Sequence, residues 1–442
     1  MQRNEFGLAV STDSQAAVNK LDQACRQLLL FNGDPIAALD AALEEDESMA
    51  IAWALRAGVL AQQTDAAYFD EARRSLRAAE AGAGDARERA HVEAARAQVE
   101  GRYFEATARW GAIAREHPRD LSALQLAHLG DFLLGQQSEL RDRPLQALRA
   151  WGRGEKDRGF ILGMAAFGLE ECGDFAKAEA FGREAVALEP RDGWAVHAVA
   201  HVCEMRGRAE KGAEWLRETA HSWAPDNAFG YHNWWHLALF ALDGRDHAGA
   251  LAIYDEKVRP KPSTILLENV DATALLWRLF IDGADVGDRF GEVAESWART
   301  IGDGVYAFND VHAILAFIGA GRRHDAMKML AALKQRAAES DDNGLMARFV
   351  GLPVGQAFVD FAEGRYDACA DALADVRGRA QRFGGSHAQR DIISLTLLEA
   401  ARRAGRKAQA EALAAERVEH KPNSPWARAL AARVAGEQAK AA

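Results

Sequence analysis

Three segments of this 442-residue chain repeat one short pattern: a glycine, an aromatic residue two positions later, and a small residue five positions after the glycine. They are residues 101–106 (GRYFEA), 173–178 (GDFAKA) and 364–369 (GRYDAC). Glycine is favoured where a helix ends, and a small residue lets the next helix pack closely. After the first two segments the chain runs to Pro118 or Pro190, which would end the second helix. The pattern predicts pairs of antiparallel helices, and no strands are expected.

This unit resembles the tetratricopeptide repeat, a helix-turn-helix of about 34 residues. Glycine turn signals recur along the chain and predict roughly seven to nine such hairpins. We therefore expect an all-α fold, a right-handed α-solenoid that forms a single domain over residues 1–442. Within it we expect an irregular N-terminal helical cap (1–80), a repeat array (81–380) and a C-terminal capping hairpin (381–442).

The composition argues against several classes of partner. The chain has 65 acidic and 54 basic residues, well mixed, and a formal charge of −11. Nucleic acid is not an expected partner, because a phosphate backbone needs a basic surface. We find no stretch apolar and long enough to span a bilayer, and the four cysteines are isolated from one another. We expect a cytoplasmic protein with reduced cysteines and no membrane partner.

Histidine and tryptophan are concentrated in residues 194–236, which hold five of the 13 histidines and five of the 11 tryptophans. Two segments there are predicted to be neighbouring inner helices, and helical periodicity assigns a packing side and a groove side to each. The groove sides carry Trp194, His197, His201 and Glu204 on the first segment and His232, Trp235 and His236 on the second. Trp234 falls on the packing side and is expected in the core. In a repeat solenoid, groove sides line one concave surface, so we expect both groups to face one cavity.

Histidines four residues apart lie on one face of a helix. His197 with His201, and His232 with His236, are two such pairs, and helices packed about 8–10 Å apart would bring them together. This set could hold zinc, iron or manganese, with Glu204 one turn further along. The spacing also permits a hydrogen-bonded network without metal or direct contact with a ligand, since neither pair carries the glutamate of a zincin motif.

Further positions are candidates for chemistry. Asp310 and His312 lie close in sequence, and Asp271 is expected on the preceding inner helix. A carboxylate beside an imidazole can serve acid/base catalysis or orient a metal-bound histidine. A helix N-cap is an equally good interpretation of Asp310. Arg390 follows a predicted capping box at residues 386–389, and could clamp the carboxylate of a ligand.

A series of short sequence motifs, taken in their order along the chain, resembles the tetratricopeptide repeat protein 38 family over nearly the full length of the chain. Among them are residues 194–205 (WAVHAVAHVCEM), 232–236 (HNWWH), 275–279 (LLWRL), 308–312 (FNDVH), 384–391 (GGSHAQRD) and 421–425 (KPNSP). The resemblance implies a helical-repeat fold, and it implies no particular reaction.

The first hypothesis for function is a solenoid whose concave cavity binds a small molecule or a short peptide. Its ligand-binding residues would be Trp194, His197, His201, Glu204, His232, Trp235, His236, Asp271 and Arg390. The alternative is a metal-dependent enzyme, a hydrolase in which the four histidines hold the metal and Glu204, or Asp310 with His312, acts in acid/base catalysis. A third hypothesis is a scaffold that binds a protein partner along an open groove.

Overall fold

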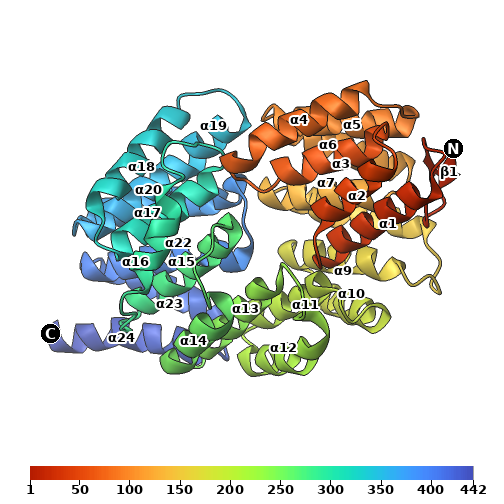
Figure 1. Ribbon diagram of the computed structural model, residues 1–442. Coiled ribbons are helices and arrows are strands. Elements are labelled where there is room, and N and C mark those ends of the chain that lie inside the picture. The colour runs from red at the N-terminus through yellow and green to blue at the C-terminus, as the bar shows by residue number, and fades with distance from the viewer. Residues whose placement is uncertain (442) are drawn as a thin grey trace. The chain divides into compact units, whose positions relative to one another are not determined.

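The computed structural model describes residues 1–441, with side chains described to residue 436. Within that range the chain is helical except for loops and a two-stranded antiparallel ribbon, β1 (Gln2–Arg3) and β2 (Ala9–Val10) (Figure 1). The all-α prediction is confirmed, and the expectation of no strands is wrong only for this short ribbon. The chain falls into two compact units. The first consists of Met1–Val199 with Thr219–Gly230, and the second of Ala200–Glu218 with Tyr231–Ala442.

The helices of the first unit are α1 (Gln15–Leu30), α2 (Pro35–Glu45), α3 (Ala50–Ala61), α4 (Phe69–Ala81), α5 (Ala86–Val99), α6 (Tyr103–Glu116), α7 (Leu121–Leu133), α8 (Gln137–Ala147), α9 (Arg158–Glu171) and α10 (Phe175–Leu188). Residues of both units occur in α11 (Gly193–Met205), α12 (Ala209–Trp223) and α13 (Gly230–Asp243). The second unit continues with α14 (His247–Ile253), α15 (Leu266–Ile281), α16 (Arg289–Ala298), α17 (Ala307–Gly319), α18 (Arg323–Arg336), α19 (Asp342–Met346), α20 (Leu352–Ala362), α21 (Tyr366–Val376), α22 (His387–Arg403), α23 (Lys407–His420) and α24 (Pro425–Ala441).

The glycine of each repeated segment ends a helix, as predicted. Gly101, Gly173 and Gly364 have positive φ angles between 75° and 83°, and each lies two residues past one helix and two before the next. In each turn the N–H after the glycine donates to a carbonyl oxygen five residues earlier, at 2.8–2.9 Å. This bond satisfies a carbonyl that the helix end leaves without a helical partner. The turns join α5 to α6, α9 to α10 and α20 to α21, and the helices of each pair pack together.

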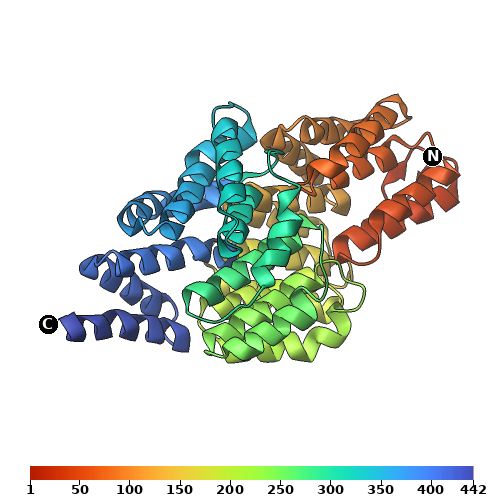
Figure 2. The same ribbon diagram turned by 60° about the vertical axis from the view of Figure 1, so that its left-hand side comes forward.

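Each unit is therefore built from tetratricopeptide-like helical hairpins, which confirms the predicted solenoid class. Small residues bring the helices close, as at Gly182 of α10, where an added Cβ would lie 2.6 Å from Val199 Cγ2. The right-handed sense of the array stays a prediction. The predicted N-terminal cap, 1–80, holds the ribbon and helices up to α4, whereas 381–442 holds α22 before the hairpin of α23 and α24 (dark blue in Figure 2).

One helical run among the described residues, Asp342–Ala362, is long and apolar enough to cross a membrane, with a mean hydropathy of 1.2. The sequence prediction that no stretch passes this test is wrong for this run. Of its most apolar window, 61% is buried inside the protein. There α20 packs on α17 and α21. A core helix passes the same test of length and composition, and its burial places this run in the core of the second unit.

Helix α15 lies at the centre of the second unit and is buried along nearly all of its length. It packs against α16, α17 and α22. Trp277 Nε1 donates to Thr396 Oγ1 of α22 at 2.9 Å, so even this interior tryptophan has its polar group satisfied. Because α15 is surrounded, the polar residues Asp271 and Arg278 on it are held inside the protein, each 1% exposed.

A clasp joins the end of α1 to the loop before α13 within the first unit. Asn32 Nδ2 donates to the carbonyl oxygen of Asp226 at 3.1 Å, across 194 residues of sequence. The N–H of Ala228 donates to the carbonyl oxygen of Phe31 at 2.6 Å. The clasp accounts for the assignment of residues 219–230 to the first unit, away from their neighbours in sequence.

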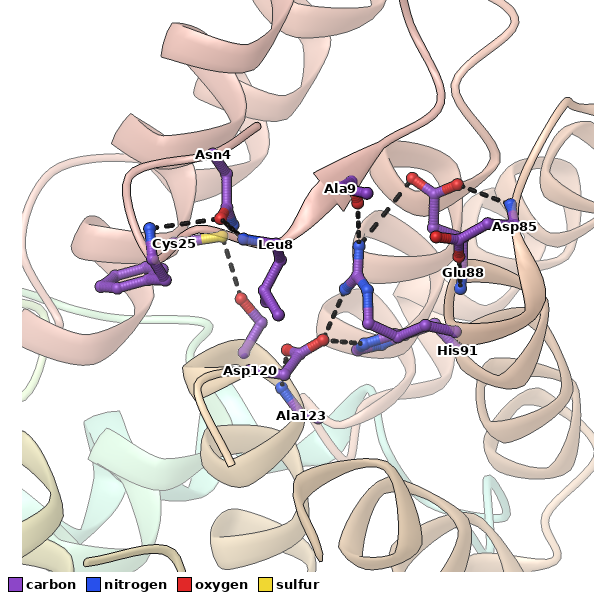
Figure 3. Close-up of polar contacts among 12 residues, drawn as sticks. Asn4, Leu8, Ala9, Cys25, Asp85, Glu88, His91, Asp120 and Ala123 are labelled. Carbon is purple, nitrogen blue, oxygen red and sulfur yellow. Dashed lines mark hydrogen bonds and ion pairs between the residues drawn. The ribbon is translucent and has the colours of Figure 1, made fainter. Parts of the chain in front are cut away.

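A buried ion cluster ties β2, α5 and α7 together in the first unit (Figure 3). Asp120 caps α7 by accepting from the N–H of Ala123 at 3.0 Å. Its other oxygen accepts from Arg87 at 2.5 Å and contacts His91 Nε2 at 3.0 Å, while Arg87 also donates to the carbonyl oxygen of Ala9. Burial alone would raise the pKa of Asp120, but His91 and Arg87 hold it below its ordinary value.

Replacing Asp120 with asparagine is expected to destabilise the first unit by about 3–5 kcal/mol, because the buried Arg87 guanidinium loses its counter-charge. Folding holds the pKa of Asp120 low, so its contribution is present above the ordinary carboxyl pKa of about 4 and is lost as pH falls below it. Thermal unfolding followed by circular dichroism should show a gap between wild type and variant that narrows in acid.

The control for this substitution is Asp70→Asn, which removes an exposed ion pair with Arg73. Exposed pairs contribute little, so the control is expected to unfold like the wild type. Equal effects of the two substitutions would contradict a stabilising role of the buried cluster.

Candidate functional site

Three of the predicted histidines meet inside the second unit. His201 comes from α11, and His232 and His236 come from α13. One nitrogen of each ring lies within 4.8 Å of the others, and all three side chains are buried. The ring centroids of His201 and His236 are 4.5 Å apart, and those of His232 and His236 are 4.9 Å apart. The four-residue spacing on α13 therefore does place both rings on one face, as predicted.

Two carboxylates, the buried Asp271 and the largely buried Glu204, fix the orientation of the α13 histidines. His232 Nδ1 lies 2.5 Å from Asp271 Oδ2 of α15, and His236 Nδ1 lies 3.0 Å from Glu204 Oε2 of α11. A ring that donates its Nδ1–H to a carboxylate carries its lone pair on Nε2, the nitrogen on the other side. This is the arrangement in which carboxylates orient metal-bound histidines in proteins.

Each carboxylate is held in turn by a second contact. Asp271 Oδ1 accepts from Gln389 Nε2 at 3.3 Å, and Gln389 belongs to the predicted capping box with Ser386, which is confirmed. Glu204 Oε1 lies 3.6 Å from Lys421 Nζ. The carboxylates are thus fixed by elements far away in sequence, and the histidines are fixed through them.

Burial sets the charges of the site. Burial and the neighbouring His201 together lower the pKa of His236 to about 3, against the opposing effect of Glu204. For Glu204, burial alone would raise the pKa, but the charge of Lys421 and the hydrogen bond from His236 bring it below its ordinary value. At neutral pH the site therefore combines a neutral imidazole with an ionised carboxylate, which is the protonation state that metal binding requires.

The aromatic residues of the second unit are placed differently from the prediction. Trp235 is fully buried. Its ring stacks on that of His232, with the centroids 5.2 Å apart and an angle of 16° between the planes. The Arg278 guanidinium also lies over the Trp235 ring, 5.4 Å from the ring centroid. Trp234, predicted in the core, is only half-buried, and the ammonium of Lys257 lies 5.6 Å from its ring centroid. The core assignment of Trp234 is wrong, because α13 turns Trp235 into the interior and leaves Trp234 partly exposed.

His197 and Trp194 belong to the first unit. His197 lies one turn before His201 on α11, and its ring packs against Phe167, Trp194 and Phe229 at centroid distances of 5.1–5.2 Å. Trp194 is buried, and its Nε1 donates to His128 Nε2 at 3.0 Å. In the first unit these two residues are therefore part of an aromatic cluster. A ligand role for either stays a prediction.

The remaining candidates lie apart from the three histidines. His312 Nδ1 contacts the carbonyl oxygen of Phe308 on its own helix at 2.8 Å, and no hydrogen bond with Asp310 occurs among the described residues. Asp310 lies in the first turn of α17, whose N-cap is Tyr306, and burial raises the pKa of Asp310 to about 7. Neither the acid/base pair nor the N-cap interpretation matches this geometry, since residues two apart on a helix point to different sides.

Arg390 is buried at the start of α22. Its guanidinium donates to the carbonyl oxygen of Gly385 and lies 3.4 Å from His387 Nδ1. These contacts hold the glycine turn before α22. A carboxylate clamp by Arg390 stays a prediction.

Sequence reasoning missed three residues around the site: Lys421, Gln389 and Arg278. Lys421 and Arg278 lie in short segments that resemble the tetratricopeptide repeat protein 38 family. This resemblance was the only signal in the sequence that could have pointed to them. Gln389 was expected only as part of a helix cap.

No family model matches the chain, so the resemblance to the tetratricopeptide repeat protein 38 family stays a prediction. The fold is similar to a chain in the crystal structure of the APC/C hetero-tetramer Cut9–Hcn1. The two share 14% sequence identity and a TM-score of 0.44, over 93% of this chain and 69% of that chain. A likeness this distant carries no argument about function.

The buried His128 of the first unit provides a pH test of the folded protein. Burial lowers its pKa to about 3, whereas an unfolded histidine titrates at about 6.5. As pH falls below 6.5 the unfolded state takes up a proton that the folded state excludes, so stability falls by about 1.4 kcal/mol per pH unit for this group. His128→Gln, whose amide oxygen still accepts from Trp194, is expected to reduce the loss of thermal stability between about pH 6.5 and 5. The exposed His324→Gln is the control, and an unchanged pH dependence in His128→Gln would contradict the prediction.

Proposed function

We propose that this helical-repeat protein binds a divalent transition metal ion, zinc, iron or manganese, through His201, His232 and His236. The observation that carries the proposal is the meeting of three buried imidazole nitrogens within 4.8 Å, two of them on rings whose Nδ1 contacts a carboxylate. Helical-repeat proteins commonly serve as binding scaffolds. The metal site would give this scaffold a chemical function.

The donor set fits a metal of this class. Zinc accepts three histidines in catalytic sites and keeps a fourth position for water or substrate, with bonds of about 2.0–2.1 Å. Donors around such an ion lie about 3.4 Å apart, so rings that meet within 4.8 Å need only small rotations to bind it. The three histidines are buried, and carboxylates orient the two on α13, as they orient metal-bound histidines in proteins.

The proposal also assigns roles to the two carboxylates. Glu204 and Asp271 each contact the Nδ1 of a ligand histidine, which makes them positioning residues. A three-histidine centre with an open position would lower the pKa of bound water and could serve hydrolysis. A metal-dependent hydrolase is therefore the enzyme class that we propose, and Glu204 would act in it by orienting His236.

Metal content tests the proposal directly. Untagged protein measured by inductively coupled plasma mass spectrometry is expected to contain a transition metal in near-stoichiometric amount, and His201→Ala/His236→Ala is expected to reduce it to background. The matched control is the exposed pair His324→Ala/His420→Ala, which should leave the metal in place. Wild-type protein without metal after zinc, iron and manganese have each been supplied, or an unchanged content in the first variant, would refute the site.

The positioning role makes a separate prediction. Glu204→Gln or Asp271→Asn should weaken metal binding about 10–100-fold, because the ligand ring loses the partner that orients it and raises its basicity. Competition with a chromogenic chelator measures the affinity. Glu339→Gln, which changes an exposed carboxylate, serves as control. Affinity equal to the wild type in both positioning variants would show that the carboxylates do not act on the metal.

A further inference from the structure

A pocket opens in the second unit next to the three histidines. Its walls include three cationic and three acidic side chains, and Leu239, Phe240 and Trp426 supply apolar surface. The charged residues are Arg278, Arg417, Lys421, Glu204, Asp243 and Asp391. The space between the walls is about 360 Å³, open solvent included, so the pocket suits a small ligand.

Two of the three cations in this pocket already have carboxylate partners. Arg417 donates both of its terminal nitrogens to Asp391, at 2.8 and 2.9 Å. Lys421 lies 3.6 Å from Glu204. Asp243 accepts from Ser424, and burial raises its pKa, which favours its neutral form.

Arg278 is the exception. Its side chain is 1% exposed, and its contacts are with the carbonyl oxygens of Ala274, Ala388 and Gln389 and with the ring of Trp235. Among the described residues no carboxylate forms an ion pair with Arg278, and the charges of Asp391, Glu204 and Asp271 act on it only from further away. Burial lowers the pKa of Arg278 to about 10, so the guanidinium remains charged at neutral pH.

Three other buried arginines of this chain are compensated by direct ion pairs. Arg56 pairs with Asp40, Arg87 with Asp120, and Arg259 with Glu292. A buried cation without a counter-charge costs several kcal/mol, which carbonyl oxygens offset only in part. The lack of a direct ion pair at Arg278, among the described residues, therefore points to an anion that arrives from the pocket.

We propose that Arg278 binds the carboxylate of a small, otherwise apolar monocarboxylate in this pocket. A guanidinium matches the planar, two-oxygen geometry of a carboxylate. The carboxylates of Glu204 and Asp391 in the pocket wall would repel a doubly charged phosphate more strongly than a singly charged carboxylate. The apolar walls of Leu239, Phe240 and Trp426 suit the carbon chain of such a ligand.

The proposed carboxylate site has its own cation, Arg278, which is not one of the proposed metal ligands. None of the three histidines lines the pocket, and its links to them are Trp235, which contacts both Arg278 and His232, and Glu204, which contacts His236. Metal content measured in the same samples therefore distinguishes failure of the metal proposal from failure of this one.

The test is isothermal titration calorimetry with butyrate as the probe. Wild-type protein is expected to bind butyrate, and to bind the neutral analogue butyramide and inorganic phosphate at least tenfold more weakly. Arg278→Gln should weaken butyrate binding at least tenfold. Arg259→Gln is the matched control, because it changes a buried arginine of the same unit away from the pocket.

A second variant keeps the test decisive if Arg278→Gln does not fold. Ala209→Phe places a ring in the pocket from the start of α12 and leaves Arg278 in place. It should abolish butyrate binding while circular dichroism stays native. No butyrate binding by the wild type, equal binding of butyramide or phosphate, or undiminished binding by folded Arg278→Gln or Ala209→Phe would each overturn the proposal.

Discussion

Two buried imidazole–carboxylate contacts set the register of the helices in the second unit. His232 with Asp271 joins α13 to α15, and His236 with Glu204 joins α13 to α11. Apolar helix faces tolerate small slips past one another, because dispersion contacts are non-directional. A buried charged hydrogen bond does not tolerate them, since a slip would leave an ionised group without its partner at a large cost. Asp271 of α15 meets this requirement by contacting His232 of α13 and accepting a hydrogen bond from Gln389 of α22.

Glu204 connects the two proposed sites of the unit. One of its oxygens contacts His236 and the other faces Lys421, at the wall of the pocket that contains Arg278. Trp235 makes a second connection, because it contacts both His232 and the Arg278 guanidinium. If both sites are occupied, a charge bound at one acts on groups shared with the other. Their affinities would then be linked, and the linkage would be reciprocal.

The sequence predicts the features that depend on neighbouring residues. The glycines at 101, 173 and 364 end helices because the backbone there must adopt positive φ, and the capping box at Ser386 depends on a residue three positions away. The pairing of His232 with His236 follows from helical spacing.

Partners from distant elements follow from no such local rule. The sequence favours Asp310 for acid/base chemistry as readily as Asp271, yet only Asp271 contacts one of the three histidines. Lys421 and Gln389 reach the site from more than 100 residues away, through packing that periodicity does not encode. Trp234 and Trp235 are adjacent and chemically identical, and the rotation of α13 about its axis decides which of them is buried.

The clasp between Asn32 and Asp226 has a consequence for synthesis of the protein. The first unit needs residues 219–230, yet residues 200–218 belong to the second unit, so neither unit is made from one uninterrupted stretch of chain. An N-terminal unit ordinarily folds as soon as it has emerged from the ribosome. Here the end of α1 must wait for nearly 200 further residues, about 10–40 seconds at 5–20 residues per second. During that interval the carbonyl oxygen of Phe31 lacks the N–H of Ala228 as a donor, and this edge of the first unit stays incomplete.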